Sequence, residues 1–297
     1  MSSFNLVIAG VKILLSSTNP LLMNLQKKMD LKSYQFDKEL DSKFLEVFEY
    51  EDFKKEAEEI ICEINTKYRE AEDLSDDFSK NLEEEIYKVL KDGEQVTKDL
   101  IIKLYEYTLN DLLKRNNCKI EGGRIVLPDE EKSILKDSPE INSILQFYSN
   151  KKTDKNDMIT LLYTKSIKGY LAAQIIREVL LKTFDTNLTI NINSIGEEGQ
   201  KTNYNKPDQE LVNNLKAFFK NIMQSYAKKN YEMNVFVTGG FRVFAIFSSI
   251  FASSFCYDNI YFMFEGSEEL LCINLGNTDS KATIRNLLSQ INESNNS

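Results

Sequence analysis

Residues 158–192 read MITLLYTKSIKGYLAAQIIREVLLKTFDTNLTINI, and this stretch decides the fold. It opens on residues 158–163 and closes on residues 188–192, two segments of strand length that are rich in aliphatic and β-branched side chains. Between them, residues 169–184 carry apolar side chains at helical spacing. A strand, a helix and a second strand in this order predict a parallel β-α-β unit, because parallel strands need a crossover connection.

The same alternation continues on both sides of this unit. An apolar run from Asn5 to Ser17 predicts a central strand covered on both faces. Further helices are predicted at 138–148, 208–227 and 241–255, and further strands at 234–237, 260–264 and 269–273. We therefore expect an α/β fold, with a parallel sheet and helices on both of its faces.

The chain between residues 36 and 116 has a different character. Apolar residues recur there at helical spacing among Glu and Lys, and no strand signal interrupts them. This pattern predicts an inserted α-helical subdomain that packs or dimerises. We divide the chain into an α/β domain, residues 1–35 and 118–297, and a helical insertion, residues 36–117, followed by a short hairpin around Gly122-Gly123.

Two features of the composition restrict the chemistry. The chain has no histidine, which removes Ser-His-Asp and Cys-His catalysis as well as His-ligated zinc. Its four cysteines lack the CxxC spacing of a zinc site and indicate free thiols in the cytoplasm. No metal-binding spacing stands out among the carboxylates, so we expect neither a metal nor another cofactor.

The overall charge of the chain argues against a polyanionic partner such as duplex DNA. A net charge of −9 disfavours duplex DNA, whose phosphates need a basic surface, but it leaves room for a local pocket that binds a small anion. The apolar segment at 243–256 is shorter than the about 20 residues that span a bilayer. We expect a soluble, cytoplasmic protein with no duplex DNA or membrane partner.

Hydroxyl-bearing, small and basic side chains follow three of the predicted strands. They are Ser16, Ser17, Thr18 and Asn19 after the first strand, Thr164, Lys165 and Ser166 after the second, and Thr238, Gly239, Gly240, Phe241 and Arg242 after the fourth. The carboxyl ends of parallel strands meet at one edge, where α/β proteins bind ligands. Hydroxyls, glycine N–H groups and two cations suit phosphates. Each turn taken alone can also be a plain strand–helix connection whose hydroxyls cap the helix.

The third of these turns resembles a known signature. Residues 234–242, N-V-F-V-T-G-G-F-R, resemble the N-x-TGGYK motif of CARF (CRISPR-associated Rossmann fold) domains, and within that group the ring nuclease type. Four further segments resemble motifs of this family in the same order. They are residues 18–25 (TNPLLMNL), 138–143 (SPEINS), 162–173 (LYTKSIKGYLAA) and 260–265 (IYFMFE).

The resemblance implies a Rossmann-like fold and a homodimer that binds cyclic oligoadenylate across its twofold axis. Many members cleave cyclic tetra-adenylate without a metal, since the ribose 2′-hydroxyl attacks the adjacent phosphate while the protein aligns the groups and stabilises the charge. Three positions depart from the family pattern: its catalytic serine falls on Pro20, its TGG-loop lysine on Arg242, and the aspartate of its second motif on Lys165. Arg242 and Ser17 are then the candidate catalytic residues.

Three functions remain open from the sequence. The first is binding of cyclic oligoadenylate, with cyclic tetra-adenylate as the expected ring, in type III CRISPR antiviral signalling, together with slow metal-independent cleavage. The second is a catalytically inactive sensor that signals to a partner through the helical insertion. The third is an unrelated nucleotide-binding α/β protein. Because the family's serine and lysine are replaced, binding is better supported than cleavage.

Overall fold

The computed structural model describes only part of the chain. The described residues are 2–9, 48–56, 58–59, 109–110, 112–114, 116–127, 138–149, 153–164, 166–184, 188–195, 209–226, 231–238, 242–263 and 269–275, with single positions at 62, 93, 98 and 151. The strands are β1 (Ser3–Ile8), β2 (Lys119–Glu121), β3 (Arg124–Val126), β4 (Met158–Thr164), β5 (Thr189–Ile195), β6 (Glu232–Phe236), β7 (Asn259–Phe262) and β8 (Leu271–Asn274). The labelled helices are α7 (Pro139–Ser149), α8 (Ile167–Thr183), α9 (Gln209–Tyr226) and α10 (Arg242–Ser254).

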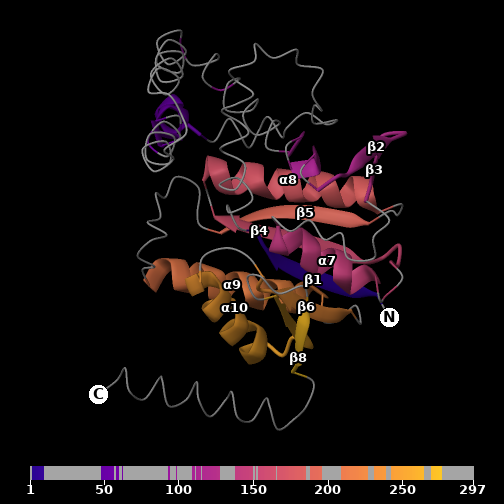
Figure 1. The fold of residues 1–297 in the computed structure, drawn as a ribbon. Helices are drawn as coiled ribbons and strands as arrows, with labels where there is room; N and C mark the ends of the chain where they lie inside the picture. The colour runs from indigo at the N-terminus through magenta and orange to yellow at the C-terminus, as the bar shows by residue number, and fades with distance from the viewer. Residues whose placement is uncertain are drawn as a thin grey trace.

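Six of these strands form one sheet in the order β5-β4-β1-β6-β7-β8 (Figure 1). All neighbouring pairs are parallel except β7 and β8, which are antiparallel. The order starts from β1 and grows outward on both sides, as in Rossmann-like sheets. The predicted α/β fold is confirmed, and the predicted closing strand at 269–273 corresponds to the antiparallel edge strand β8.

The two faces of the sheet are covered by different helices. In β1 the side chain of Val7 belongs to one hydrophobic cluster with α7 and α8, while Leu6 and Ile8 belong to another with α9 and α10. Figure 1 shows α8 on one side of the sheet and α9 and α10 on the other. This alternation along β1 follows from the two-residue period of a strand, and it explains why every residue of the strand is buried. β1 ends at Ile8, and residues 10–17 of the predicted strand lie outside the described residues.

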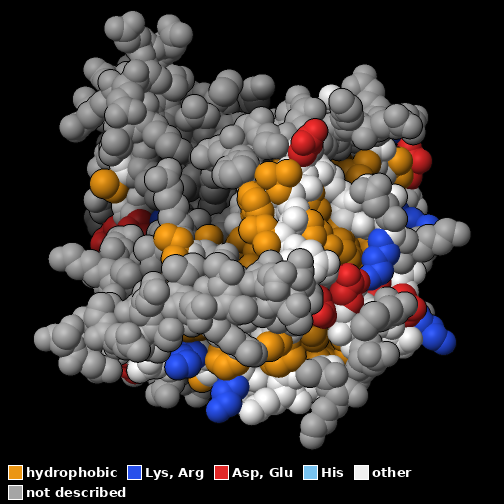
Figure 2. All heavy atoms as spheres, turned by 90° about the horizontal axis from the view of Figure 1, so that it is seen from below, with side chains coloured by type: hydrophobic (Ala, Val, Ile, Leu, Met, Phe, Trp, Pro, Cys, Tyr) orange, Lys and Arg blue, Asp and Glu red, His pale blue; other side chains and the backbone are white. Residues whose placement is uncertain are grey.

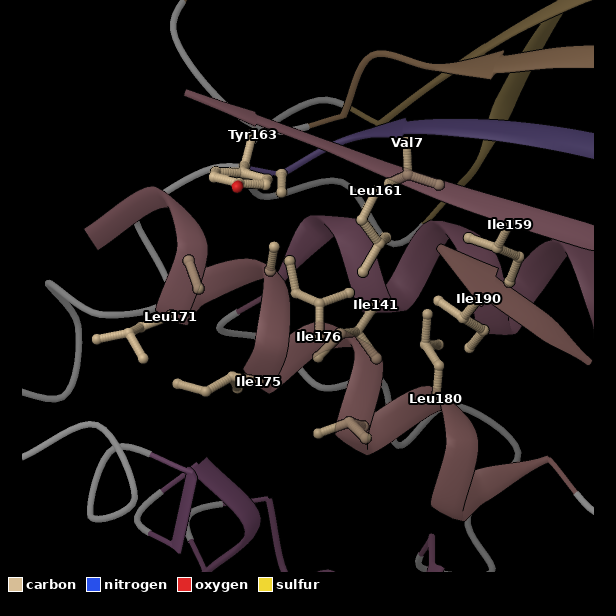
Figure 3. Close-up of a cluster of buried hydrophobic side chains, with 14 of the residues drawn as sticks. Val7, Ile141, Ile159, Leu161, Tyr163, Leu171, Ile175, Ile176, Leu180 and Ile190 are labelled. Carbon is tan, nitrogen blue, oxygen red and sulfur yellow. The ribbon is translucent and has the colours of Figure 1, made fainter. Parts of the chain in front are cut away.

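Helix α8 is buried on both of its sides. Figure 3 shows Ile176 and Leu180 pointing toward the sheet, while Leu171 and Ile175 point away from it. All four side chains have no exposed surface. The side that faces away from the sheet is covered by apolar residues from the predicted insertion, which belong to the same cluster: Phe48, Phe53, Leu109, Leu112 and Leu113. The insertion therefore shares a hydrophobic core with the α/β sheet.

Parts of the predicted helical insertion are confirmed as helix, notably residues 50–56. Lys168 near the start of α8 forms ion pairs with Glu59 at 3.1 Å and with Glu56 at 3.9 Å. The predicted hairpin is also present, since β2 and β3 pair across Gly122 and Gly123, whose φ angles of 58° and 79° suit glycine.

A row of asparagines crosses the sheet beneath α7. Asn234 of β6 donates its amide hydrogen to Asn5 Oδ1 of β1 at 2.9 Å, and Asn259 of β7 donates to Asn234 Oδ1 at 2.9 Å. Asn5 in turn donates to the Tyr148 hydroxyl of α7 at 2.8 Å. The three asparagines are register partners, so this ladder ties the centre of the sheet to the helix above it.

The face that carries α9 and α10 is partly apolar at its surface. Figure 2 looks at the molecule from this side and shows hydrophobic side chains gathered there. Ile246 of α10 and Leu271 and Ile273 of β8 are exposed. Among the described residues, no helix combines the length and the apolar character that crossing a membrane would require.

Candidate ligand-binding site

The candidate site lies at the carboxyl ends of β4, β1 and β6. From β1 the chain adds β4 and then β5 on one side of β1. It then crosses to the other side of β1, where it adds β6, β7 and β8, so the strand order reverses between β1 and β6. Open α/β sheets bind ligands at such a switch point. Two predicted site residues, Thr164 and Thr238, follow the strands on either side of β1. The spacing between strands places them roughly 10 Å apart.

On the β4 side, a tight turn brings the hydroxyl groups of Thr164 and Ser166 close to the backbone N–H of Gly169. Ser166 caps α8, and its Oγ accepts a hydrogen bond from the Gly169 N–H at 3.0 Å. Thr164 Oγ1 lies 3.4 Å from Ser166 Oγ. Gly169 leaves no space for a side chain, because a Cβ there would lie 2.3 Å from the Thr164 carbonyl oxygen. The structure therefore brings the predicted residues Thr164 and Ser166 together, with Ser166 also serving as a helix cap.

On the β6 side, Thr238 contacts a residue from α7 that lies 95 positions earlier in the chain. Its Oγ1 is 3.1 Å from Ser143 Oγ. Ser143 Oγ also donates to the backbone carbonyl of Glu140 at 2.8 Å. Ser143 and Glu140 are fully buried, whereas Thr238 is half-buried. The first turn and a half of α7 thus form one wall of the candidate site.

Ser143 and Glu140 are not among the site residues predicted from the sequence. The sequence feature that could have located them is the Ser138-Pro139-Glu140 start of α7. In the structure, Ser138 Oγ accepts a hydrogen bond from the Ile141 N–H at 3.3 Å and donates one to Glu140 Oε2 at 3.1 Å. A capping serine with proline at the first helical position marks a helix start. The contact with Thr238 joins distant segments, so local sequence carries no sign of it.

Three helix N-termini point toward this edge of the sheet. α8 and α10 begin directly after β4 and β6, and the start of α7 is held beside Thr238 by Ser143. Helix N-termini carry a partial positive charge and N–H groups that are not bonded within the helix. At α7 the Ile141 and Asn142 N–H groups are bonded to Ser138, and Glu140 places its own carboxylate in the first turn, so the N-termini of α8 and α10 are the ones that favour an anionic group at the switch point.

Most of the other predicted site residues lie outside the described part of the chain. They are Ser16, Ser17, Thr18, Asn19, Lys165, Gly239, Gly240 and Phe241. Arg242 is the first residue of α10, which confirms the helix predicted at 241–255. The roles proposed for these residues stay predictions.

The clearly shifted pKa values belong to tyrosine and cysteine side chains outside the candidate site. Burial raises the pKa of Tyr148, Tyr257 and Tyr261 above the ordinary tyrosine value. Burial also raises the pKa of the Cys118 and Cys272 thiols. These groups stay protonated at neutral pH, so they act as hydrogen-bond donors and not as bases or nucleophiles. Within the described ranges, no group of three or more Asp, Glu or Cys side chains is placed to hold a metal.

The segment from α7 to β8, which holds five of the six strands of the main sheet, shows similarity to a known family. Residues 136–275 match the model of a CRISPR-associated protein family (Cas_APE2256). The match supports a CRISPR-related role. It spans the turns after β4 and β6 and the start of α7, which together hold Thr164, Thr238 and Ser143. No curated protein matches the chain.

Proposed function

We propose that this chain binds cyclic oligoadenylate at the switch point between β1 and β6, as a homodimer in type III CRISPR signalling. The observation that carries the proposal is the site at the carboxyl edge, where Thr164 and Thr238 flank β1 within the segment that matches a CRISPR-associated family. Cyclic tetra-adenylate is the expected ring. The N-termini of α8 and α10 favour its phosphates, and the hydroxyl groups can bond to its riboses and bases.

The same site can also cleave the ring without a metal. The ribose 2′-oxygen attacks the adjacent phosphorus, the bond from phosphorus to the 5′-oxygen breaks, and the 2′-hydroxyl proton ends on the leaving 5′-oxygen. The products are linear, with a 2′,3′-cyclic phosphate at one end and a 5′-hydroxyl at the other. In this proposal Arg242 stabilises the charge on the phosphate and Ser17 takes the place of the family's catalytic serine, which is Pro20 here.

The alternative is an inactive sensor that signals through the helical insertion. Its support is the close packing of the insertion on α8, where Phe53 shares the core cluster and Lys168 pairs with Glu59 at 3.1 Å. α8 starts at the site, because its cap Ser166 follows Thr164 in the β4 turn. A ligand that moved this turn would therefore act on the insertion through one helix.

The first test is incubation of the purified chain with cyclic tetra-adenylate and cyclic hexa-adenylate in EDTA. Binding is measured by isothermal titration calorimetry, and the products are separated by chromatography. Linear products with 2′,3′-cyclic phosphate ends would identify a ring nuclease, and loss of turnover in Arg242→Ala would assign that residue. Retention of the intact ring would identify the sensor. Failure to bind either ring would overturn the proposal and leave an unrelated nucleotide-binding protein.

The predicted homodimer has its own measurement. Sedimentation equilibrium with and without the ring gives the mass of the species in solution. A dimer that binds one ring per two chains is the expected result, because a ring with its own twofold symmetry can contact the same residues of both copies. One ring bound per single chain would contradict the dimeric site.

A further inference from the structure

We propose that Thr238 acts as a hydrogen-bond acceptor for a neutral donor of the ligand, a ribose 2′-hydroxyl or an adenine amino group, and that Ser143 is the positioning residue that holds it in this role. This inference rests on the proposed function and adds which kind of ligand group Thr238 selects. It refines the sequence-based expectation that the hydroxyl, glycine and basic residues at this edge suit phosphates.

The argument begins with the single proton of Ser143. A serine hydroxyl has one hydrogen to donate and two lone pairs that accept. Ser143 Oγ lies 2.8 Å from the carbonyl oxygen of Glu140, which can only accept, so Ser143 donates its proton there. Ser143 is fully buried, so water does not compete for this bond.

The proton between Ser143 and Thr238 must then come from Thr238. The two oxygens are 3.1 Å apart, a distance at which one hydroxyl donates to the other. With the Ser143 proton committed to Glu140, Thr238 is the donor and Ser143 the acceptor. The Thr238 hydroxyl keeps only its lone pairs for the site, since it has no second hydrogen.

An oxygen that presents only lone pairs selects what binds next to it. A phosphate oxygen carries no hydrogen at neutral pH, so placing it against Thr238 Oγ1 would leave two acceptors facing each other. A ribose hydroxyl or an adenine amino group brings the missing hydrogen. Thr238 is half-buried and stands at the end of β6, where a ligand at the switch point can reach it.

This division of roles agrees with the other groups at the edge. The helix N-termini of α8 and α10 are donors and suit the phosphates. Thr238, locked by Ser143, supplies an acceptor. A cyclic oligoadenylate presents both kinds of group, phosphate acceptors and hydroxyl or amino donors, and so can match both.

The test compares three rings by calorimetry: cyclic tetra-adenylate, its 2′-deoxy analogue and its N6,N6-dimethyl analogue. The 2′-deoxy ring lacks the hydroxyl donors, and the dimethyl ring lacks the amino donors. For the unmodified protein, one of the analogues should bind roughly fivefold more weakly than the natural ring, the size of a neutral hydrogen bond. That analogue identifies the donor.

Variants then show whether Thr238 is responsible. In Thr238→Val the natural ring should weaken roughly fivefold and the selective analogue should show no further loss. Thr238→Ser keeps the hydroxyl and should preserve the selectivity. Ser143→Ala frees the Thr238 proton, so the Kd of the selective analogue divided by the Kd of the natural ring should fall toward one. Ser149→Ala, at the far end of α7, is the matched control and should leave that ratio unchanged.

Two results would overturn the inference while leaving the proposed function intact. The first is an unmodified protein that binds all three rings equally. The second is a Thr238→Val variant that keeps the full selectivity between natural and modified rings. If the unmodified protein binds no ring at all, the proposed function fails first. Thermal unfolding of each variant guards against loss of fold, and Thr238→Ser provides the comparison if the valine variant does not fold.

Discussion

Gly169 occupies a position in the β4–α8 turn where no side chain fits. A Cβ would lie 2.3 Å from the Thr164 carbonyl oxygen and 2.8 Å from Thr164 Oγ1, and the first of these is a backbone atom that cannot turn aside. The glycine thus lets the capping turn close onto the strand end, which holds Thr164 and Ser166 in place.

Gly169→Ala should lower the free energy of unfolding by about 2 kcal/mol, because the new methyl group forces the turn apart. Urea unfolding followed by circular dichroism measures the change. Gly122→Asn is the control: nothing lies within 4 Å of Gly122, and its φ of 58° is one that asparagine tolerates. Equal stability of Gly169→Ala and the unmodified protein would contradict the close approach.

Three tyrosines with raised pKa values make the free energy of unfolding fall at alkaline pH. Burial raises the pKa of Tyr148, Tyr257 and Tyr261 above the ordinary value of 10.0 that they regain on unfolding. The unfolded chain therefore loses these protons at a lower pH than the folded one. Their contribution to stability is complete below pH 10.0 and is lost as the pH rises above it.

Above the ordinary tyrosine pKa, the free energy of unfolding of Tyr257→Phe should fall less steeply with pH than that of the unmodified protein, by about 1.4 kcal/mol per pH unit. The Tyr257 hydroxyl makes one long bond, 3.4 Å to the Phe219 carbonyl, so its removal disturbs little else. The measurement is the free energy of unfolding from urea titrations at a series of pH values on both sides of the tyrosine pKa. Parallel curves for the two proteins would show that Tyr257 is not protected in the folded state.

At the level of the elements, the asparagine ladder joins three strands that come from distant parts of the sequence. Asn234 stands in the middle, donating to Asn5 and accepting from Asn259, and all three are buried. A buried polar row is stable only when each group has its partner, so the ladder favours one register of β1, β6 and β7.

Asn234→Ala should lower the free energy of unfolding by about 2 to 3 kcal/mol, because Asn5 Oδ1 loses its donor inside the core. Asn191→Ala is the matched control, since Asn191 is exposed on the edge strand β5. Guanidinium unfolding followed by tyrosine fluorescence compares the two variants. Losses of similar size would indicate that the ladder contributes no more than an exposed asparagine.

For the whole molecule, the decisive feature is that the helical segment and the sheet share one core. Phe53 has no exposed surface and belongs to the same cluster as Ile175 of α8. Phe53→Ala should therefore destabilise the entire protein by about 3 kcal/mol or more and keep a single unfolding transition.

Ile246→Ala is the control for this prediction, because Ile246 is 58% exposed and its truncation should change stability by less than about 0.5 kcal/mol. Differential scanning calorimetry distinguishes one transition from two. A separate early transition in Phe53→Ala, with the main one unmoved, would mean that the helical segment unfolds independently of the sheet.

The sequence by itself determined the class of fold and where to look for a site. Residues 158–192 specify a strand, a helix and a strand, because burial on both faces makes β4 mostly apolar and packing on the sheet spaces the apolar residues of α8 at the helical period. The same local rules located the hairpin at Gly122-Gly123 and the polar turns that hold Thr164 and Thr238. Propensity, period and turn chemistry act over a few residues, so a single sequence displays them.

Only the tertiary structure decided which of these segments meet. The strand order, the antiparallel direction of β8 and the burial of α8 on both sides depend on packing between distant residues. The contact of Ser143 with Thr238 spans 95 positions, and that of Asn234 with Asn5 spans 229. Such hydrogen bonds cannot be predicted from hydrophobic periodicity, because the sequence around each residue would be the same if that residue had a different partner. The inferred donation from Thr238 to Ser143 follows from that contact together with the bond from Ser143 to the Glu140 carbonyl.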